Sequence, residues 1–182
     1  QGIFRGTASV VNLSDAGGAT ANANVVVTGT QVTGFAGSAD ASVVNYLTVE
    51  TLALTGNANP ESFTVAATVA ATTINALGGL DVLSALDQTT IGAAGLAMNG
   101  GGQGESLTIN GGAGPETIGV SSTQVTRNSG GTITYAGLAA LVVNGTAAID
   151  TITVTSTAAA TATTVNALGG LDVLSALDQT TI

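Results

Sequence analysis

Short runs in which apolar and polar residues alternate fill most of the chain, and turns rich in glycine, asparagine and alanine separate them. The runs are rich in Val, Ile and Thr, and their apolar residues often stand two positions apart, as in SFTVAATV and GTITYAGL. Side chains two apart lie on one face of a β-strand, so the pattern predicts strands in preference to helices. One segment, DVLSALDQ, occurs twice and has leucines three apart, Leu83 and Leu86 in its first copy, so we expect a strand or a short helical turn there.

The chain also repeats itself. Residues 71–91 and 162–182 are identical at 20 of 21 positions and differ only where Val165 replaces Ile74. Self-similarity of this kind is typical of chains built from successive copies of one structural unit. A looser match extends the repeat upstream in both copies, to about 52–91 and 141–182.

The repeating unit has four parts: a strand that ends in Asn or Thr, a Gly/Ala turn, an acidic residue and a second strand. Amide side chains at one position of successive units can hydrogen-bond to each other along a stack of strands, as they do in cross-β structures. The turn ladder predicted in this way consists of Thr55, Asn75, Asn110, Asn144 and Asn166. The acidic residues that follow these turns are Glu61, Asp81, Glu116, Asp150 and Asp172.

We therefore predict an all-β fold, and within it a parallel β-helix (β-solenoid) of about 5–7 coils, since the units are long enough for complete coils. The alternative is an antiparallel β-sandwich with two similar halves, because the spacing of the units is irregular. The β-repeat domain covers residues 21–182. Residues 1–20 fit the repeat poorly but contain a strand-like piece, Thr7–Leu13, so we expect this atypical segment to be donated as a strand to a neighbouring molecule.

The amino-acid composition excludes most kinds of catalytic and metal-binding sites. The 182 residues include 2 basic and 11 acidic residues and no Cys, His or Trp. The usual ligands of zinc, haem and iron–sulfur clusters are therefore missing, as are Ser-His-Asp and Cys-His arrangements. The two basic residues, Arg5 and Arg127, are too few to neutralise a nucleic-acid backbone, and we expect Arg127 to be a solvated turn residue. We expect no enzyme, no cofactor, no nucleic-acid partner and, because polar residues interrupt the most apolar stretch (Val65–Leu86), no membrane span.

One segment, GGAGPETIG at 111–119, resembles the glycine-rich nonapeptide of RTX calcium β-rolls, with Glu116 where that family has Asp. Longer segments, such as LVVNGTAAIDTITV, are similar to the degenerate Gly/Asp-rich β-repeats of large secreted or cell-surface bacterial proteins of the planctomycete type. This resemblance implies an extracellular or cell-surface protein that is not an enzyme.

The acidic turns could bind a hard cation such as calcium, because calcium takes oxygen ligands. The candidate ligands are Glu61, Asp81, Glu116, Asp150 and Asp172. Shared calcium sites in β-rolls need tandem nonapeptides, whereas the segments here are separated by other sequence. The alternative is that each carboxylate caps the amides of its turn or faces solvent.

A stack of strands leaves unpaired N–H and C=O groups at both of its ends. The chain stops at Ile182 inside a repeat whose first copy continues into Gly92, and no capping helix is predicted there. We therefore expect a structural subunit of an extracellular bacterial fibre or surface layer that polymerises head to tail with copies of itself by β-strand addition. The alternative is a spacer or adhesin-like repeat segment of a larger cell-surface protein, stabilised by calcium.

Overall fold

The computed structural model describes residues 3–4, 9–35 and 42–177, and this part of the chain is all-β. Its strands form two mixed sheets of nine strands each. In spatial order the first sheet contains β1 (Ile3–Phe4), β5 (Val43–Tyr46), β4 (Gln31–Thr33), β3 (Val25–Val27), β7 (Ser62–Val65), β9 (Val82–Ala85), β11 (Ser106–Ile109), β15 (Ala140–Asn144) and β17 (Ala162–Asn166). The second sheet contains β18 (Val173–Ala176), β16 (Thr151–Val154), β12 (Thr117–Val120), β13 (Gln124–Arg127), β14 (Ile133–Ala136), β10 (Leu96–Asn99), β8 (Ala71–Asn75), β6 (Thr51–Thr55) and β2 (Val10–Ser14).

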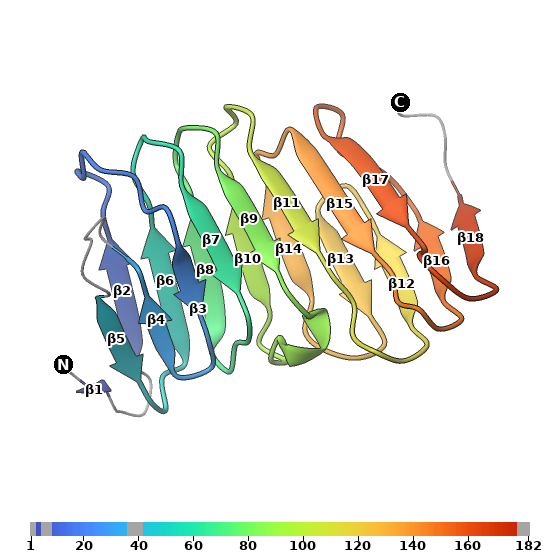
Figure 1. Cartoon of the computed structure of the whole chain (residues 1–182), viewed down its shortest axis with the longest axis horizontal. Coiled ribbons are helices and arrows are strands. Elements are labelled where there is room, and N and C mark those ends of the chain that lie inside the picture. Colours follow the sequence, from blue (N-terminus) through green and yellow to red (C-terminus); the bar gives the residue numbers. More distant parts are fainter. Residues whose placement is uncertain (1–2, 5–8, 36–41, 178–182) are drawn as a thin grey trace.

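For much of its length the chain alternates between the two sheets. From β6 to β11 every strand lies in the sheet opposite to the one before it, and each of the strands β6 to β9 pairs in parallel with the strand two places later. Figure 1 shows the result as two layers of strands that progress along the long axis from the N-terminal to the C-terminal end. Two three-stranded antiparallel segments, β3–β4–β5 and β12–β13–β14, interrupt this pattern and make both sheets mixed. The all-β prediction is confirmed, while the purely parallel arrangement is found only in part.

The core lies between the sheets and is filled by alternate residues of each strand. In β6 (TLALT) the side chains of Leu52 and Leu54 are fully buried, whereas those of Thr51, Ala53 and Thr55 are half-exposed on the outer face. This is the alternation that a strand imposes when one face is packed and the other is solvated. On the outer faces of the sheets, small Thr, Ser and Ala side chains take the positions that charged residues occupy in most proteins.

The strand pairings divide into two equivalent halves. Seven pairings occur among β1–β9, and the same seven recur among β10–β18 when nine is added to each strand number. The two remaining pairings, β8–β10 and β9–β11, join the halves. The predicted repeat at about 52–91 and 141–182 is part of this duplication and covers β6–β9 and β15–β18; sequence identity is high only over β8–β9 and β17–β18.

The two halves occupy opposite sheets. Strand β6 belongs to the second sheet, and its counterpart β15 belongs to the first; the same exchange holds for β7 and β16. The reason is that the chain crosses from sheet to sheet an odd number of times, seven, between β1 and β10. A second copy therefore begins on the side opposite to the first.

The N-terminal segment takes part in this scheme. Within residues 1–20, β2 pairs in parallel with β6 of the same chain, and β1 pairs with β5, just as β11 pairs with β15 and β10 with β14. The segment is thus the first part of the first half, although its sequence matches the repeat poorly. Part of the expected donated piece, Thr7–Leu13, lies outside the described residues, and its donation to a neighbour stays a prediction.

The twice-repeated DVLSALDQ segment forms strand β9 in its first copy, followed by a 3-10 turn at Gln88–Thr90 that the side chain of Asp87 caps. The expected strand is found, whereas the 3-10 turn begins only at Gln88, the last residue of the segment. The described residues contain no helix long and apolar enough to cross a membrane.

Identical residues in the two halves allow a direct test of the core. We expect Leu83→Ala to lower the free energy of unfolding by about 2–5 kcal/mol, because the side chain is fully buried and its removal leaves a cavity. The matched variant Leu174→Ala, at a side chain that is 59 % exposed, should cost less than about 0.5 kcal/mol in the unassembled chain. Urea denaturation of both variants measures the difference, and equal losses would contradict the assigned burial.

Candidate functional site

The predicted turn ladder exists, but as two separate rows. Asn144 donates from Nδ2 to Oδ1 of Asn110 at 2.7 Å, and Asn166 donates in the same way to Asn144 at 2.8 Å. In the other sheet Asn99 donates to Oδ1 of Asn75 at 2.9 Å. Both rows stand at the ends of parallel strands, where successive amides can hydrogen-bond along the sheet.

Two details of the ladder differ from the prediction. Thr55 lies next to Asn75 in the strand register, although no hydrogen bond joins their side chains among the described contacts. Asn99 was not predicted as a ladder residue. The signal for it was present, because Asn99 ends a strand, a glycine turn follows and Glu105 comes next, which is the same four-part unit.

The acidic residues form two columns, one beside each sheet. Oδ1 of Asp81 accepts the main-chain N–H of Glu61 at 2.7 Å, just before β9 and β7 of the first sheet. Beside the second sheet Oδ1 of Asp150 accepts the N–H of Glu116 at 2.8 Å, and Oδ1 of Asp172 accepts the N–H of Asp150 at 2.8 Å. Each of these three aspartates thus bonds to the main chain at the preceding acidic position, and the exchange of sheets divides the five acidic residues into two groups.

Several of these carboxylates also close their own turns. Glu61 accepts the N–H of Asn57 at 3.0 Å, and Asp150 accepts the N–H of Thr146 at 2.6 Å. The glycine five residues before the acid makes room for it: a Cβ at Gly56 would lie 1.7 Å from Oε2 of Glu61, and one at Gly145 would lie 2.6 Å from Oδ2 of Asp150. The recurrent Gly-x-x-x-x-Asp/Glu pattern therefore has a structural cause in the capping of the turn.

Calcium binding at these residues gains no support from their positions. Among the described residues no three Asp or Glu side chains come together in a group that could hold a metal ion. The alternative stated from the sequence, that the carboxylates cap turn amides, describes the contacts of Glu61, Glu116 and Asp150.

Asp81 is the least satisfied of the carboxylates. The residue is 1 % exposed, and its Oδ2 atom is the one buried side-chain oxygen or nitrogen in the described part of the chain that has no hydrogen-bond partner. Burial, together with the charges of Glu61 and Glu105, raises the pKa of Asp81 to about 6, although the N–H of Glu61 opposes the shift. Burial likewise raises the pKa of Glu61.

Glu105 follows Asp81 in the first column and behaves in the opposite way. Burial alone would raise its pKa, but several main-chain N–H groups, among them those of Gln103 and Gly104, bond to the carboxylate and together hold its pKa below the usual range. This side chain therefore stays ionised inside its glycine-rich turn.

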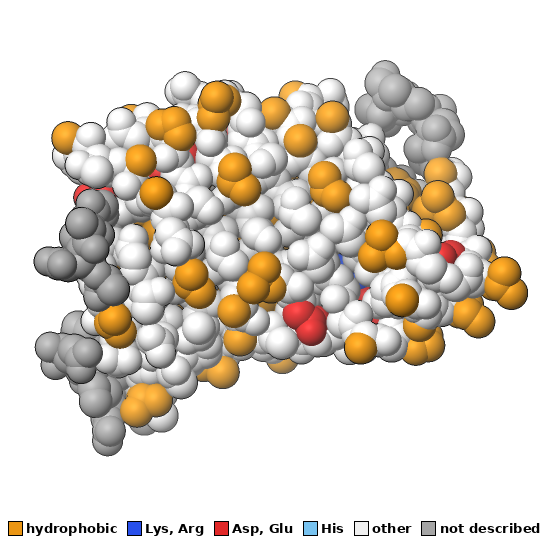
Figure 2. All heavy atoms as spheres, in the orientation of Figure 1, with side chains coloured by type: hydrophobic (Ala, Val, Ile, Leu, Met, Phe, Trp, Pro, Cys, Tyr) orange, Lys and Arg blue, Asp and Glu red, His pale blue; other side chains and the backbone are white. Residues whose placement is uncertain are grey.

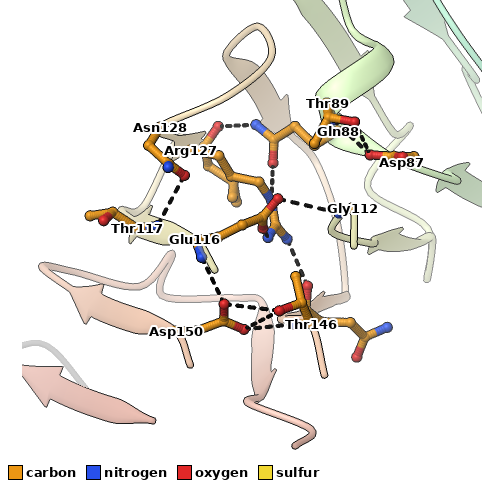
Figure 3. Close-up of polar contacts among 12 residues, drawn as sticks. Asp87, Gln88, Thr89, Gly112, Glu116, Thr117, Arg127, Asn128, Thr146 and Asp150 are labelled. Carbon is orange, nitrogen blue, oxygen red and sulfur yellow. Dashed lines mark hydrogen bonds and ion pairs between the residues drawn. The ribbon is translucent and has the colours of Figure 1, made fainter. Parts of the chain in front are cut away.

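Arg127 lies at the centre of a buried polar network, contrary to the expectation that it is a solvated turn residue. It forms an ion pair with Glu116, donates from Nε to Oε1 of Gln88 at 2.7 Å and donates from Nη2 to the carbonyl of Asn144 at 2.7 Å (Figure 3). Gln88 in turn donates to the carbonyl of Gly131 at 2.9 Å. Gln88 belongs to the first half and the other four residues to the second, so the network helps to hold the halves together.

The described outer surface has a shallow hollow and a distinctive end. A hollow of about 250 Å³ on the second sheet is lined by Thr, Ala, Gly and Leu residues, and no ionisable side chain reaches it. The more distinctive surface is the C-terminal end of the stack, formed by β17 and β18. Hydrophobic side chains gather at this end in Figure 2. They include Leu168, Leu171, Val173, Leu174 and Leu177, each more than half exposed.

The same sequence is covered in the first half. Leu83 in β9 is fully buried where β11 pairs with that strand, whereas Leu174, its counterpart in β18, is 59 % exposed. Ile74 in β8 is fully buried, and its counterpart Val165 in β17 is only half-buried. Among the described residues no strand pairs with the outer edges of β17 and β18, which are therefore the candidate site for self-association.

The buried network generates one prediction. Replacing Arg127 by Met should lower the free energy of unfolding by about 3–5 kcal/mol, because Glu116 is left as a buried charge without its partner. Adding Glu116→Gln to this variant removes that charge, so the double variant should be more stable than Arg127→Met alone. Urea denaturation at pH 7 measures both, and a double variant that loses the sum of the two single losses would contradict the ion pair.

Asp81 generates a prediction about pH. Since the pKa of Asp81 is raised from 3.8 to about 6 in the folded chain, this group contributes stability that is fully present below pH 4 and is lost as the pH rises through about 6. Asp81→Asn should make the fall in unfolding free energy over that interval shallower. The measurement is urea denaturation from pH 4 to pH 7, with Asp172→Asn in the second copy as the matched control. An unchanged slope in Asp81→Asn would show that another group is responsible.

Comparisons of the chain with protein-family models, with curated proteins and with solved structures found no match.

Proposed function

We propose that the chain is a structural subunit of an extracellular fibre or surface layer, and that it polymerises head to tail by β-strand addition. The observation that carries this proposal is the pair of nearly identical 21-residue segments. The first segment is covered by β10 and β11, while the second presents the same apolar and main-chain groups uncovered at β17 and β18.

The energetics favour covering this end. An open strand edge exposes N–H and C=O groups that pair with another strand, and Leu174 adds apolar area that association removes from water. The same residue type, Leu83, is fully buried when a following strand is present, so the required packing is already realised inside the chain. A head-to-tail contact that extends the stack along its long axis does not close into a ring, and it therefore generates a filament.

The polymer proposed here is a two-sided β-solenoid. The parallel pairing of alternate strands in two facing sheets supports it, and addition at the ends would extend both sheets along the same axis. The Asn rows and the acid–amide contacts at the turns would continue with the strands. With 11 acidic and 2 basic residues, subunits repel one another, so added salt should favour assembly by screening that repulsion.

A spacer or adhesin-like segment of a longer cell-surface protein is the second candidate. The internal duplication favours it, because two joined halves show that copies of this unit can follow one another within a single chain. In that case the end of the stack would be covered by a further repeat of the same polypeptide, and the isolated chain would stay monomeric.

Electron microscopy of the purified chain, with and without a calcium chelator, tests the proposal. We expect uniform filaments in both conditions; dispersed monomers would contradict the fibre subunit and favour the spacer, and filaments that dissolve with the chelator would assign the acidic turns to calcium.

Charge substitutions at the exposed end sharpen this experiment. Leu174→Arg should abolish filaments, because the equivalent Leu83 is fully buried when its end is covered. Leu171→Arg is the matched control and should assemble normally, because its counterpart Leu80 is 65 % exposed even in the covered first half. Equal assembly of both variants would show that filaments form through another surface.

A further inference from the structure

The junction between the two halves specifies how one molecule would meet the next. We infer that β1 of one copy pairs in parallel with β17 of the preceding copy, and that β2 pairs with β18, in the register that the chain uses internally for β10 on β8 and β11 on β9. This inference rests on the proposed function, and adds to it the partner strands, their register and the repeat distance of the filament.

The internal junction supplies the template. In the second sheet Met98 of β10 stands opposite Ile74 of β8, and in the first sheet Leu107 of β11 stands opposite Leu83 of β9. All four side chains are buried. The main-chain N–H of Ser106 also bonds to the carbonyl of Asp81 at 2.9 Å. These contacts cover the first copy of the repeated sequence.

The strands that do the covering have counterparts at the N-terminal end. β10 pairs with β14 as β1 pairs with β5, and β11 pairs with β15 as β2 pairs with β6. The loop contacts agree as well: the carbonyl of Glu105 accepts the N–H of Ala139 at 2.9 Å, and the carbonyl of Ser9 accepts the N–H of Glu50 at 3.1 Å. Val11 is therefore the counterpart of Leu107, because the two residues pair with equivalent positions of β6 and β15.

Both sides of the contact are then fixed residue by residue. Val11 of one copy stands opposite Leu174 of the preceding one, because Leu107 stands opposite Leu83 inside the chain. In the same register Asn12 stands opposite Ser175, and Leu13 opposite Ala176. In the other sheet Phe4 takes the register position opposite Val165.

The chemistry of the two edges matches in this register. The apolar Val11 and Leu13 meet the apolar Leu174 and Ala176, and the polar Asn12 meets Ser175, so the inward and outward faces continue without interruption. Leu13 is only half-buried at its free edge, while its counterpart Ile109 inside the chain is fully buried. A shift by one residue would turn every apolar side chain to the outer face, which makes the register strongly specified.

The topology also sets the filament geometry. Because the whole chain contributes an even number of strands, nine to each sheet, the first sheet of one copy continues into the first sheet of the next. Nine strands spaced as in ordinary sheets give an axial rise of about 43 Å per subunit. The equivalent halves, which lie on opposite sheets, add a pseudo-repeat at about half that distance, related by a rotation of about half a turn.

Disulfide cross-linking tests the register, since the chain has no cysteine of its own. Neighbouring strands lie about 4.8 Å apart, which is within the Cα separation that a disulfide bridges. The variant Asn12→Cys/Ser175→Cys, oxidised after assembly, should give a ladder of oligomers on a denaturing gel. Asn12→Cys/Val173→Cys, shifted by two residues and so more than about 7 Å apart across the contact, should give none. Ser84→Cys/Thr108→Cys, an opposed pair inside the chain, is the positive control.

The outcomes separate this inference from the proposed function. Filaments in which the shifted pair cross-links as well as Asn12/Ser175, or in which only the internal pair cross-links, would overturn the register and leave the fibre subunit standing. Absence of filaments would overturn the fibre subunit and this inference with it. Diffraction or helical reconstruction of unmodified filaments gives an independent result, because a rise clearly different from about 43 Å would also overturn the inference.

Discussion

Main-chain hydrogen bonding at strand edges is the constraint on which this structure depends. Every strand has donors and acceptors on two edges, and a chain that alternates between two sheets satisfies them only with strands that come earlier or later in the sequence. Within the described residues all strands but four have a partner on both edges. The four are β1, β2, β17 and β18, two at each end, and the interior of the chain already shows how two such ends fit together.

The few charged groups serve this arrangement from inside. Glu61, Glu116 and Asp150 hold the N–H groups of glycine-containing turns, and Asp81, Asp150 and Asp172 accept the N–H of the preceding acidic position. These bonds satisfy main-chain groups that the sharp turns leave unpaired, at the cost of burying carboxylates, of which Asp81 is the extreme case. The outer faces are left nearly free of charge and lined with small side chains.

Much of the local structure was predictable, because it depends on neighbouring residues. Alternation predicted strands such as β6, and the recurrence of Asn after a strand predicted the contacts of Asn110, Asn144 and Asn166. The environment of Arg127 was not predictable, because its burial depends on Gln88 and Asn144, which are distant in sequence and which no local pattern connects to it. For the same reason the sequence predicted one turn ladder, whereas the structure has two rows of Asn side chains.

The sequence by itself therefore determined the strands, the turn chemistry and the existence of a duplication, since these follow from residue type, spacing and identity. Only the tertiary structure decided that the halves lie on opposite sheets and that two antiparallel segments interrupt the parallel order. It alone also decided that the strands of one copy, β8 and β9, are covered by following strands, while the strands of the almost identical copy, β17 and β18, have an open edge. The physical reason is that pairing between strands is non-local: an edge is covered or open according to which distant strand reaches it, and nothing in the segment itself carries that information.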